Sequence, residues 1–378
     1  LPDFSRPIPP AHYALLAVAV LGCFFIGIGG FPLFDLDEGA FSEATREMLA
    51  SGNYLSTTLN GEPRYDKPIL IYWLQAASAS LFGINEFAFR LPSALAGSGW
   101  VVLTYLFVRR AASERQALAA GIITASALAV SIIVKVATAD ALLNLLISSA
   151  LFSAYLFLRF RERKYLYLAF AAMGLGFLTK GPVAVIIPGL VTFLYSLLRN
   201  DLRGWLALAL NGRGIALFLA IAAPWYVTQY LVEGDGFFRG FFLKHNVGRF
   251  SAPMESHGGS VFYYVPVLLL SVLPYTTLLL KAFAQWRRIL KDDLQIFLLL
   301  WFATVFVIFS FSGTKLPHYL IYGYSGVFIL MAAYLDELRS RFLAFLPLLL
   351  LLAVLLFLPS VIDAAIPHIP QPYYREML

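Results

Sequence analysis

About eleven long apolar runs constrain what this chain can fold into. A helix needs ~20 mostly apolar residues to cross a bilayer. The runs that approach this length lie near 11–34, 91–108, 117–137, 140–158, 165–179, 183–198, 214–231, 261–280, 294–312, 318–335 and 342–361. A shorter apolar segment, 68–83, fits either a span or a helix at the membrane interface. The pattern predicts an all-α polytopic membrane protein.

The composition excludes the classes of protein that need a water-facing surface. Of 378 residues, 60% are hydrophobic and 13% are charged, and the mean hydropathy is +0.76. A soluble globular domain has about 45–50% apolar and 25% charged residues. A soluble enzyme, a disordered protein and a nucleic-acid-binding module are therefore excluded. The net charge of +6 is not gathered into a binding face.

The single cysteine, Cys23, excludes an internal disulfide framework and a thiolate metal cluster. It lies in the first apolar run, which we interpret as a retained anchor rather than a cleaved signal peptide. No polar stretch is long enough for a separate soluble domain. We therefore expect one transmembrane domain over residues 1–378.

Basic residues indicate the orientation, because lysine and arginine concentrate in cytoplasmic loops. Alternate loops on one side hold sixteen basic and seven acidic residues, whereas the other side holds eleven and fourteen. The basic side consists of 109–116, 159–164, 199–213, 281–293 and 335–341. The loops 35–90 and 232–260 then lie outside, and the function is expected there.

The first outer loop carries acids at a membrane exit. Residues 39–50 have the spacing of an amphipathic helix, with Phe41, Ala44 and Met48 on one face. Asp37 and Glu38 precede this helix. Such acids either cap a helix and meet its dipole or serve as a general base at the bilayer surface.

Other polar residues at span ends leave similar alternatives open. Lys67 either reaches lipid headgroups or holds a phosphate, and Asp140 either caps a helix or lies in a polar site. The segment 174–181 has some glycines of a phosphate loop but lacks the Gly-Lys-Ser/Thr order. We interpret Lys180-Gly181-Pro182 as a break between two spans.

One run of motifs is similar to a known family. It comprises Asp37-Glu38, Glu43-Ala44, Arg46-Glu47-Met48, Leu59-Asn60-Gly61, Lys67-Pro68, Tyr72-Trp73, Phe82-Gly83, Asn85-Glu86-Phe87 and Arg90-Leu91-Pro92-Ser93-Ala94. This run resembles the bacterial aminoarabinose-transferase-like membrane glycosyltransferases, relatives of the protein O-mannosyltransferases. The resemblance extends, with gaps, from about residue 11 to 340. Longer relatives continue into further spans and a C-terminal soluble domain that this sequence does not represent.

The resemblance implies a GT-C fold and a sugar donor carried on a polyprenyl phosphate, used at the periplasmic face of the bacterial inner membrane. Breaking the bond between C1 and phosphate passes through an oxocarbenium-like transition state. The leaving phosphate needs a cation and an acceptor hydroxyl needs a carboxylate base. The resemblance assigns catalytic roles to Asp37, Glu38 and Asp140, and phosphate binding to Lys67.

Further outer residues complete the expected site. Arg249, Lys315 and Tyr319 are expected to contact the donor phosphate, although each also suits an interfacial anchor. Substrate contacts are expected from three residues, which are Tyr65, Asp66 and His318. His245 is the candidate metal ligand. The sequence identifies no cofactor with certainty, and whether a divalent metal ion is used stays open.

The predicted function is transfer of a sugar from undecaprenyl phosphate to lipid A or another envelope glycan, with inversion. The alternatives are a protein O-mannosyltransferase-like enzyme, a non-enzymatic flippase for lipid-linked sugars and a non-catalytic assembly partner. Transporters place polar groups near the bilayer midplane and often show internal repeats. In this sequence most acids and bases lie at the ends of the predicted spans and no repeat is seen, which disfavours a transporter. Neither a nucleotide nor a nucleic acid is an expected partner. The sequence leaves the sugar, the acceptor and the oligomeric state open.

Overall fold

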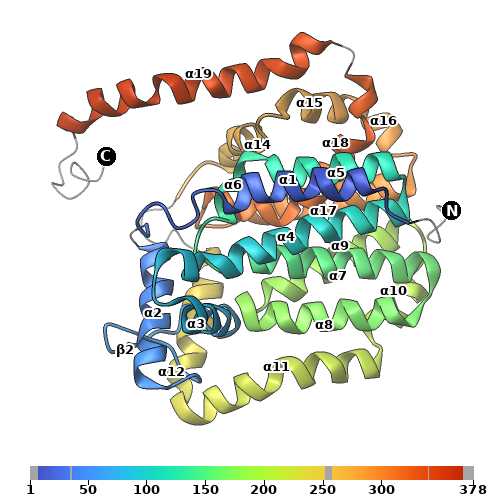
Figure 1. The fold of residues 1–378 in the computed structure, drawn as a ribbon. Coiled ribbons are helices and arrows are strands. Elements are labelled where there is room, and N and C mark those ends of the chain that lie inside the picture. Colours follow the sequence, from blue (N-terminus) through green and yellow to red (C-terminus); the bar gives the residue numbers. More distant parts are fainter. Residues whose placement is uncertain (1–6, 35, 252–257, 339, 369–378) are drawn as a thin grey trace.

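The computed structural model describes residues 7–34, 36–251, 258–338 and 340–368. The regular structure is helical apart from a short hairpin, in which β1 (Thr58–Leu59) pairs antiparallel with β2 (Glu62–Pro63). Long helices lie side by side in a bundle, and shorter ones gather at its ends (Figure 1). The predicted all-helical, multi-span architecture is confirmed.

The centre of the bundle is α7 (Asp140–Phe160), whose apolar stretch is 89% buried. It packs against α4 (Glu86–Ala111), α8 (Arg163–Lys180) and α9 (Val183–Leu198). The remaining helices of the bundle are α5 (Glu114–Ser126), α6 (Leu128–Ile133), α11 (Gly212–Glu233), α17 (Asp293–Phe311) and α18 (Tyr324–Ala333).

A buried chain of hydrogen bonds ties three of these helices together. The indole Nε1 of Trp100 donates to Ser325 Oγ at 2.7 Å, and Ser325 Oγ lies 2.8 Å from Ser148 Oγ. The chain links α4, α18 and α7, which come from distant parts of the sequence. Satisfied polar groups in an apolar core favour one specific packing arrangement.

The elements of the two outer loops meet at one end of the bundle, opposite α10 (Leu202–Ala209) (Figure 1). The first loop supplies α2 (Asp37–Ser51) and α3 (Leu70–Phe82). The other loop supplies α12 (Asp235–Phe238), the π-helical η2 (Arg239–Gly248) and α13 (Arg249–Ser251). The segments 36–90 and 232–251 therefore share one face, as the charge pattern predicts.

The predicted amphipathic helix is confirmed as α2, since Phe41, Ala44 and Met48 are all buried. It ends at Gly52, whose φ of 70° is the left-handed conformation that favours glycine after a helix.

The other elements are short or lie at the edge of the bundle. They are α1 (Pro10–Val20), η1 (Leu21–Phe25), η3 (Val261–Tyr263), α14 (Tyr264–Ser271), α15 (Thr276–Ala284), α16 (Trp286–Ile289), η4 (Pro317–Gly323), η5 (Leu335–Glu337), α19 (Arg341–Ala365) and η6 (Ile366–His368). The apolar α19 lies along an edge of the bundle (Figure 1).

Within the described parts of the chain, five helices are long and apolar enough to cross a membrane, and the pair Val261–Ser271 and Thr276–Ala284, bent by 118°, would make a sixth. The five are Glu86–Ala111, Asp140–Phe160, Gly212–Glu233, Asp293–Phe311 and Phe342–His368. Most other predicted runs form shorter or broken helices; 117–137, for example, divides into α5 and α6, whereas 165–179 lies within the continuous 18-residue α8. Only 17% of the apolar stretch of α11 and 6% of that of α19 is buried, which leaves both helices an apolar surface suited to lipid.

Candidate active site

The start of α2 is held by a fully buried ion pair between Glu38 and Arg90. The guanidinium donates from Nε and Nη2 to the two carboxylate oxygens, each at 2.8 Å, and both side chains have 0% exposure. The Glu38 carboxylate also accepts hydrogen bonds from the backbone N–H groups of Phe34 and Ala137. The Arg90 guanidinium also donates to the backbone carbonyls of Ile28, Phe31 and Pro32. Both carboxylate oxygens are thus engaged inside the fold. Glu38, for which the sequence suggested catalysis, has the contacts of a positioning residue.

Asp37 lies beside this pair and faces the opposite way. It is the first residue of α2, and Leu36 before it turns the chain with φ of 64°. No side chain caps this helix. The Asp37 carboxylate is exposed and, among the described residues, forms no hydrogen bond or ion pair. Its charge nevertheless acts on Arg64 and His318, so it faces the same region as the groups below.

Asp66 is the centre of a cluster of cations in the first outer loop. Lys67 Nζ lies 3.0 Å from Asp66 Oδ1, and Arg64 Nη2 lies 3.0 Å from Oδ2. His245 Nδ1, from η2, lies 2.9 Å from Oδ1. Burial alone would raise the pKa of Asp66, but Lys67, His245 and Arg64 together hold it well below its usual range. The carboxylate therefore stays ionised and holds Lys67 in place.

A second charged cluster forms where two spans end. Asp140 is the first residue of α7 and Lys180 the last of α8. Lys180 Nζ and the Tyr322 hydroxyl each donate to Asp140 Oδ1 at 2.5 Å, and Lys180 also donates to Tyr322 at 2.8 Å. His318 Nε2 lies 4.0 Å from the same oxygen. Ions at membrane depth are found paired in this way and mark functional sites.

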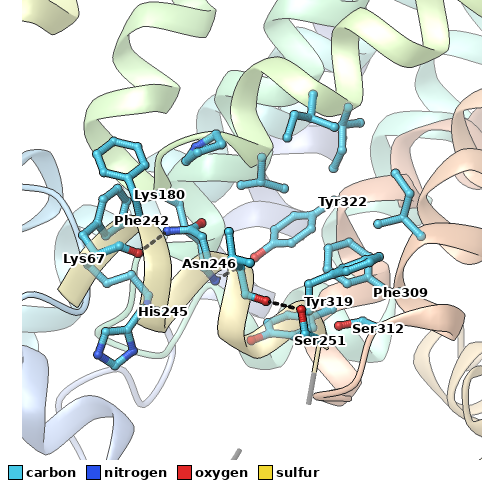
Figure 2. A pocket seen from close by; sticks show the side chains of 18 of the residues that line it. Lys67, Lys180, Phe242, His245, Asn246, Ser251, Phe309, Ser312, Tyr319 and Tyr322 are labelled. Atoms are coloured by element: carbon cyan, nitrogen blue, oxygen red, sulfur yellow. Dashed lines mark hydrogen bonds between the residues drawn. The ribbon is translucent and has the colours of Figure 1, made fainter. Parts of the chain in front are cut away.

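The two clusters share a cavity of about 620 Å³. Its polar wall contains Asp66, Lys67, Lys180 and His245, while its apolar wall is lined by Val183, Ile186, Ile187 and Leu190 of α9 and by Ile308 and Phe309 of α17. Figure 2 shows Lys67 and His245 on one side and Phe309 and Ser312 on the other. The lining of α9 extends over the eight residues 183–190, seven steps of helical rise or roughly 10 Å. The cavity therefore joins a cationic end to an apolar groove between spans.

Glycine at 181 makes room for this arrangement. Gly181 has φ of 74°, and a Cβ there would lie 2.5 Å from Phe241 Cζ. The residue ends α8 directly after Lys180 and lets Phe241 close the cavity wall. The predicted break at Lys180-Gly181-Pro182 is confirmed.

The remaining predicted residues have different surroundings. Tyr319 lines the cavity and its ring stacks on Tyr322. Lys315 is buried and donates to the carbonyl of Ser312 at 2.6 Å, next to the cavity. Tyr65 points away and donates to Glu233. Arg249 begins α13, and its side chain lies outside the described residues.

The metal prediction for His245 can be tested against the surrounding donors. His245 Nδ1 and Asp66 Oδ1 converge at 2.9 Å, so they are the described pair that would hold a divalent cation. No group of three His, Cys, Asp or Glu side chains suited to a metal occurs in the described parts of the chain.

Comparisons with known proteins identify the family. Residues 66–227 match the family described as dolichyl-phosphate-mannose-protein mannosyltransferase. An uncharacterised protein of Aquifex aeolicus is 31% identical over 377 residues, covering 95% of this chain and 84% of its own. Undecaprenyl phosphate-alpha-4-amino-4-deoxy-L-arabinose arabinosyl transferase 1 of Pseudomonas fluorescens is 30% identical, covering 92% of this chain and 64% of its own. The crystal structure of ArnT from Cupriavidus metallidurans bound to undecaprenyl phosphate superposes with a TM-score of 0.79 at 28% identity.

The chain belongs to this family of polyprenyl-phosphate-dependent membrane glycosyltransferases.

Membership confirms the resemblance that the first outer loop shows and, with the ArnT superposition, the GT-C fold. The ArnT match covers 88% of this chain and 61% of the ArnT chain. The chain thus spans less than two thirds of the length of the named aminoarabinose transferase and of ArnT.

Sequence reasoning missed Lys180, Arg64, Tyr322 and Asn246 as site residues. Asn246 lines the cavity and donates to the carbonyl of Phe241 at 2.7 Å. Lys180 had a readable signal, since it is a lysine at the outer end of a span. Arg64 also had one, since it stands two residues before Asp66 in the first outer loop. Tyr322 had none, because only the folded chain brings it to Asp140.

Proposed function

We propose that this protein is an inverting glycosyltransferase of the bacterial inner membrane, with a single GT-C domain of about eleven spans. It transfers a sugar from undecaprenyl phosphate to lipid A or another envelope glycan at the periplasmic face. The observation that carries the proposal is the cavity with lysines at one end and an apolar groove between α9 and α17 at the other. This combination suits a lipid chain with a phosphate head. The names of the curated aminoarabinose transferases support the same donor class.

In this proposal the donor phosphate lies between Lys67 and Lys180. Asp66 and Asp140 hold the two ammonium groups in position. Preorganised cations are effective where charge develops in the transition state. As the C1–O bond to the phosphate breaks, the electron pair moves to that oxygen and undecaprenyl phosphate leaves.

Asp37 acts as the general base on the other side of the sugar. Its exposed carboxylate takes the proton of the acceptor hydroxyl while the oxygen forms a bond to C1. Attack opposite the leaving phosphate inverts the configuration and needs no covalent enzyme intermediate. A phosphate acceptor such as that of lipid A is already ionised and needs this base less.

The first test measures transfer in liposomes with radiolabelled undecaprenyl-phosphate sugars and mixed lipid A, glycan and peptide acceptors. Lys67→Ala should raise the donor KM about 10–100-fold, because a hydrogen bond to a charged group contributes about 1.5–3 kcal/mol. Lys164→Ala is the matched control, since Lys164 is exposed and pairs with Glu162 among the loops at the opposite end.

The label and the acceptor that becomes labelled identify the substrates. Labelled peptide would favour the protein O-mannosyltransferase-like alternative. Donor that crosses the bilayer without transfer by wild-type protein would refute the enzyme and support a flippase.

The groove makes a separate prediction about the lipid chain. Leu190→Trp fills the apolar groove lined by α9, so the KM should rise several-fold for an undecaprenyl donor and little for a short-chain donor. Leu197→Trp is the control on the same helix, since Leu197 is exposed and lies outside the cavity wall. An equal change for both donors in Leu190→Trp would show that the lipid lies elsewhere.

A further inference from the structure

Tyr65 connects the first outer loop to the segment that follows α11. Its hydroxyl donates to Glu233 Oε2 at 2.8 Å, and its ring meets Phe237 edge to face at 6.0 Å between centroids. Glu233 is the last residue of α11. Tyr65 directly precedes Asp66 and Lys67 in the chain, so this contact fixes the backbone next to the cationic end of the cavity.

Two glycines provide the surface on which Tyr65 lies. A Cβ at Gly240 would lie 2.7 Å from Tyr65 Cβ and 2.9 Å from its Cδ2, and a Cβ at Gly236 would lie 3.2 Å from the hydroxyl. Neither glycine has a positive φ. The backbone geometry therefore accepts any residue, and the close approach of Tyr65 is what requires glycine.

The segment held in this way, 235–248, forms a large part of the cavity wall. It contributes Phe241, Phe242, Leu243, His245, Asn246 and Val247. It also meets the first outer loop at the neighbouring residue, where His245 contacts Asp66. Two adjacent residues of the loop, Tyr65 and Asp66, thus contact the segment 235–248 at two separate places.

We propose that Tyr65, Glu233, Gly236 and Gly240 form a clasp that positions the segment 235–248 over the donor phosphate. The inference rests on the proposed function and adds a group of positioning residues to it. Tyr65 is here a positioning residue rather than the substrate contact that the sequence suggested. It sets donor affinity through Asp66 and His245 without touching the donor.

The tyrosine keeps its proton throughout the physiological range. Burial and the adjacent Glu233 carboxylate raise the pKa of Tyr65 to about 12. The hydroxyl therefore keeps the proton that it donates to Glu233.

The experiment separates donor KM from kcat. Tyr65→Phe should raise the donor KM about ten-fold, as expected for one lost hydrogen bond to a charged group, with kcat within two-fold of wild type. Gly240→Ala should have at least as large an effect because Tyr65 must move. Glu233→Gln keeps an acceptor oxygen and should change the KM less. Gly212→Ala, where a Cβ meets nothing within 4 Å, is the control and should match wild type.

A second readout is binding of undecaprenyl phosphate by the purified full chain, which should weaken in parallel in Tyr65→Phe and Gly240→Ala. An unchanged donor KM and affinity in folded Tyr65→Phe and Gly240→Ala, or a fall in kcat alone, would overturn the clasp. If the proposed function is wrong, wild-type protein itself transfers no sugar, which is a different outcome. The comparison of undecaprenyl phosphate binding between wild type and the two variants then still tests the clasp.

Discussion

Asp37→Asn should lower kcat by about 10²–10⁴-fold with a hydroxyl acceptor, the usual contribution of a general base, and leave the donor KM nearly unchanged. Asparagine keeps the shape of the side chain but accepts no proton. We expect this change to have little effect on the free energy of unfolding, because Asp37 is exposed and forms no ion pair with the described residues. Initial rates at saturating donor measure the effect.

Glu62→Gln is the matched control for this prediction. Glu62 lies in β2, is exposed, and belongs to the same outer loop, so its removal alters the local charge equally. A comparable loss of rate in both variants would assign the effect to loop charge. Full activity of Asp37→Asn with a hydroxyl acceptor would remove Asp37 from the mechanism.

Arg90→Met should destabilise the protein by about 3–5 kcal/mol, because it leaves the Glu38 carboxylate buried without its counter-ion. The measurement is the midpoint of thermal or denaturant unfolding in detergent micelles. The buried pair also links the carbonyls of residues 28, 31 and 32 to α4. Transfer should therefore fall together with stability.

Two further variants give this prediction its controls. Glu38→Gln combined with Arg90→Met removes the unpaired charge and should recover part of the lost stability. Arg46→Met breaks an exposed pair with Glu43 on the same helix and should cost less than about 1 kcal/mol. Equal losses of stability in Arg46→Met and Arg90→Met would show that the buried Glu38–Arg90 pair matters no more to stability than an exposed pair.

The helices were largely predictable because apolar runs and amphipathic spacing depend on local sequence. The α2 helix and the break at Gly181 follow from such signals, and the meeting of the outer loops follows from the positive-inside rule. The pairing of Asp140 with Lys180 and Tyr322 was not predictable, since it depends on which spans are neighbours. Glu38 shows the same limit: two adjacent acids look alike in sequence, but only the fold turns one inward to Arg90 and the other outward.

The direction of the Tyr65 side chain was not predictable for the same reason, because it depends on which segments the fold brings together. An aromatic residue beside a lysine that is proposed to bind phosphate is expected to face the substrate, yet the Tyr65 ring turns toward Gly236 and Gly240. Glycines far along the chain carry no local signal that they accept a tyrosine. Contacts between loops, rather than the helices themselves, are therefore what the sequence alone left undetermined.

The Asp140–Lys180 pair has a consequence for depth in the bilayer. The two residues stand at the outer ends of α7 and α8, an antiparallel hairpin. The 21 residues of α7 rise about 31 Å, close to the ~30 Å thickness of the hydrocarbon core. In the orientation proposed above, the hairpin would hold the Lys180 ammonium group near the phosphate layer of the outer leaflet. The proposed donor, a polyprenyl phosphate in that leaflet, would then arrive with its phosphate head at the height of the site, and its search for the enzyme would be two-dimensional.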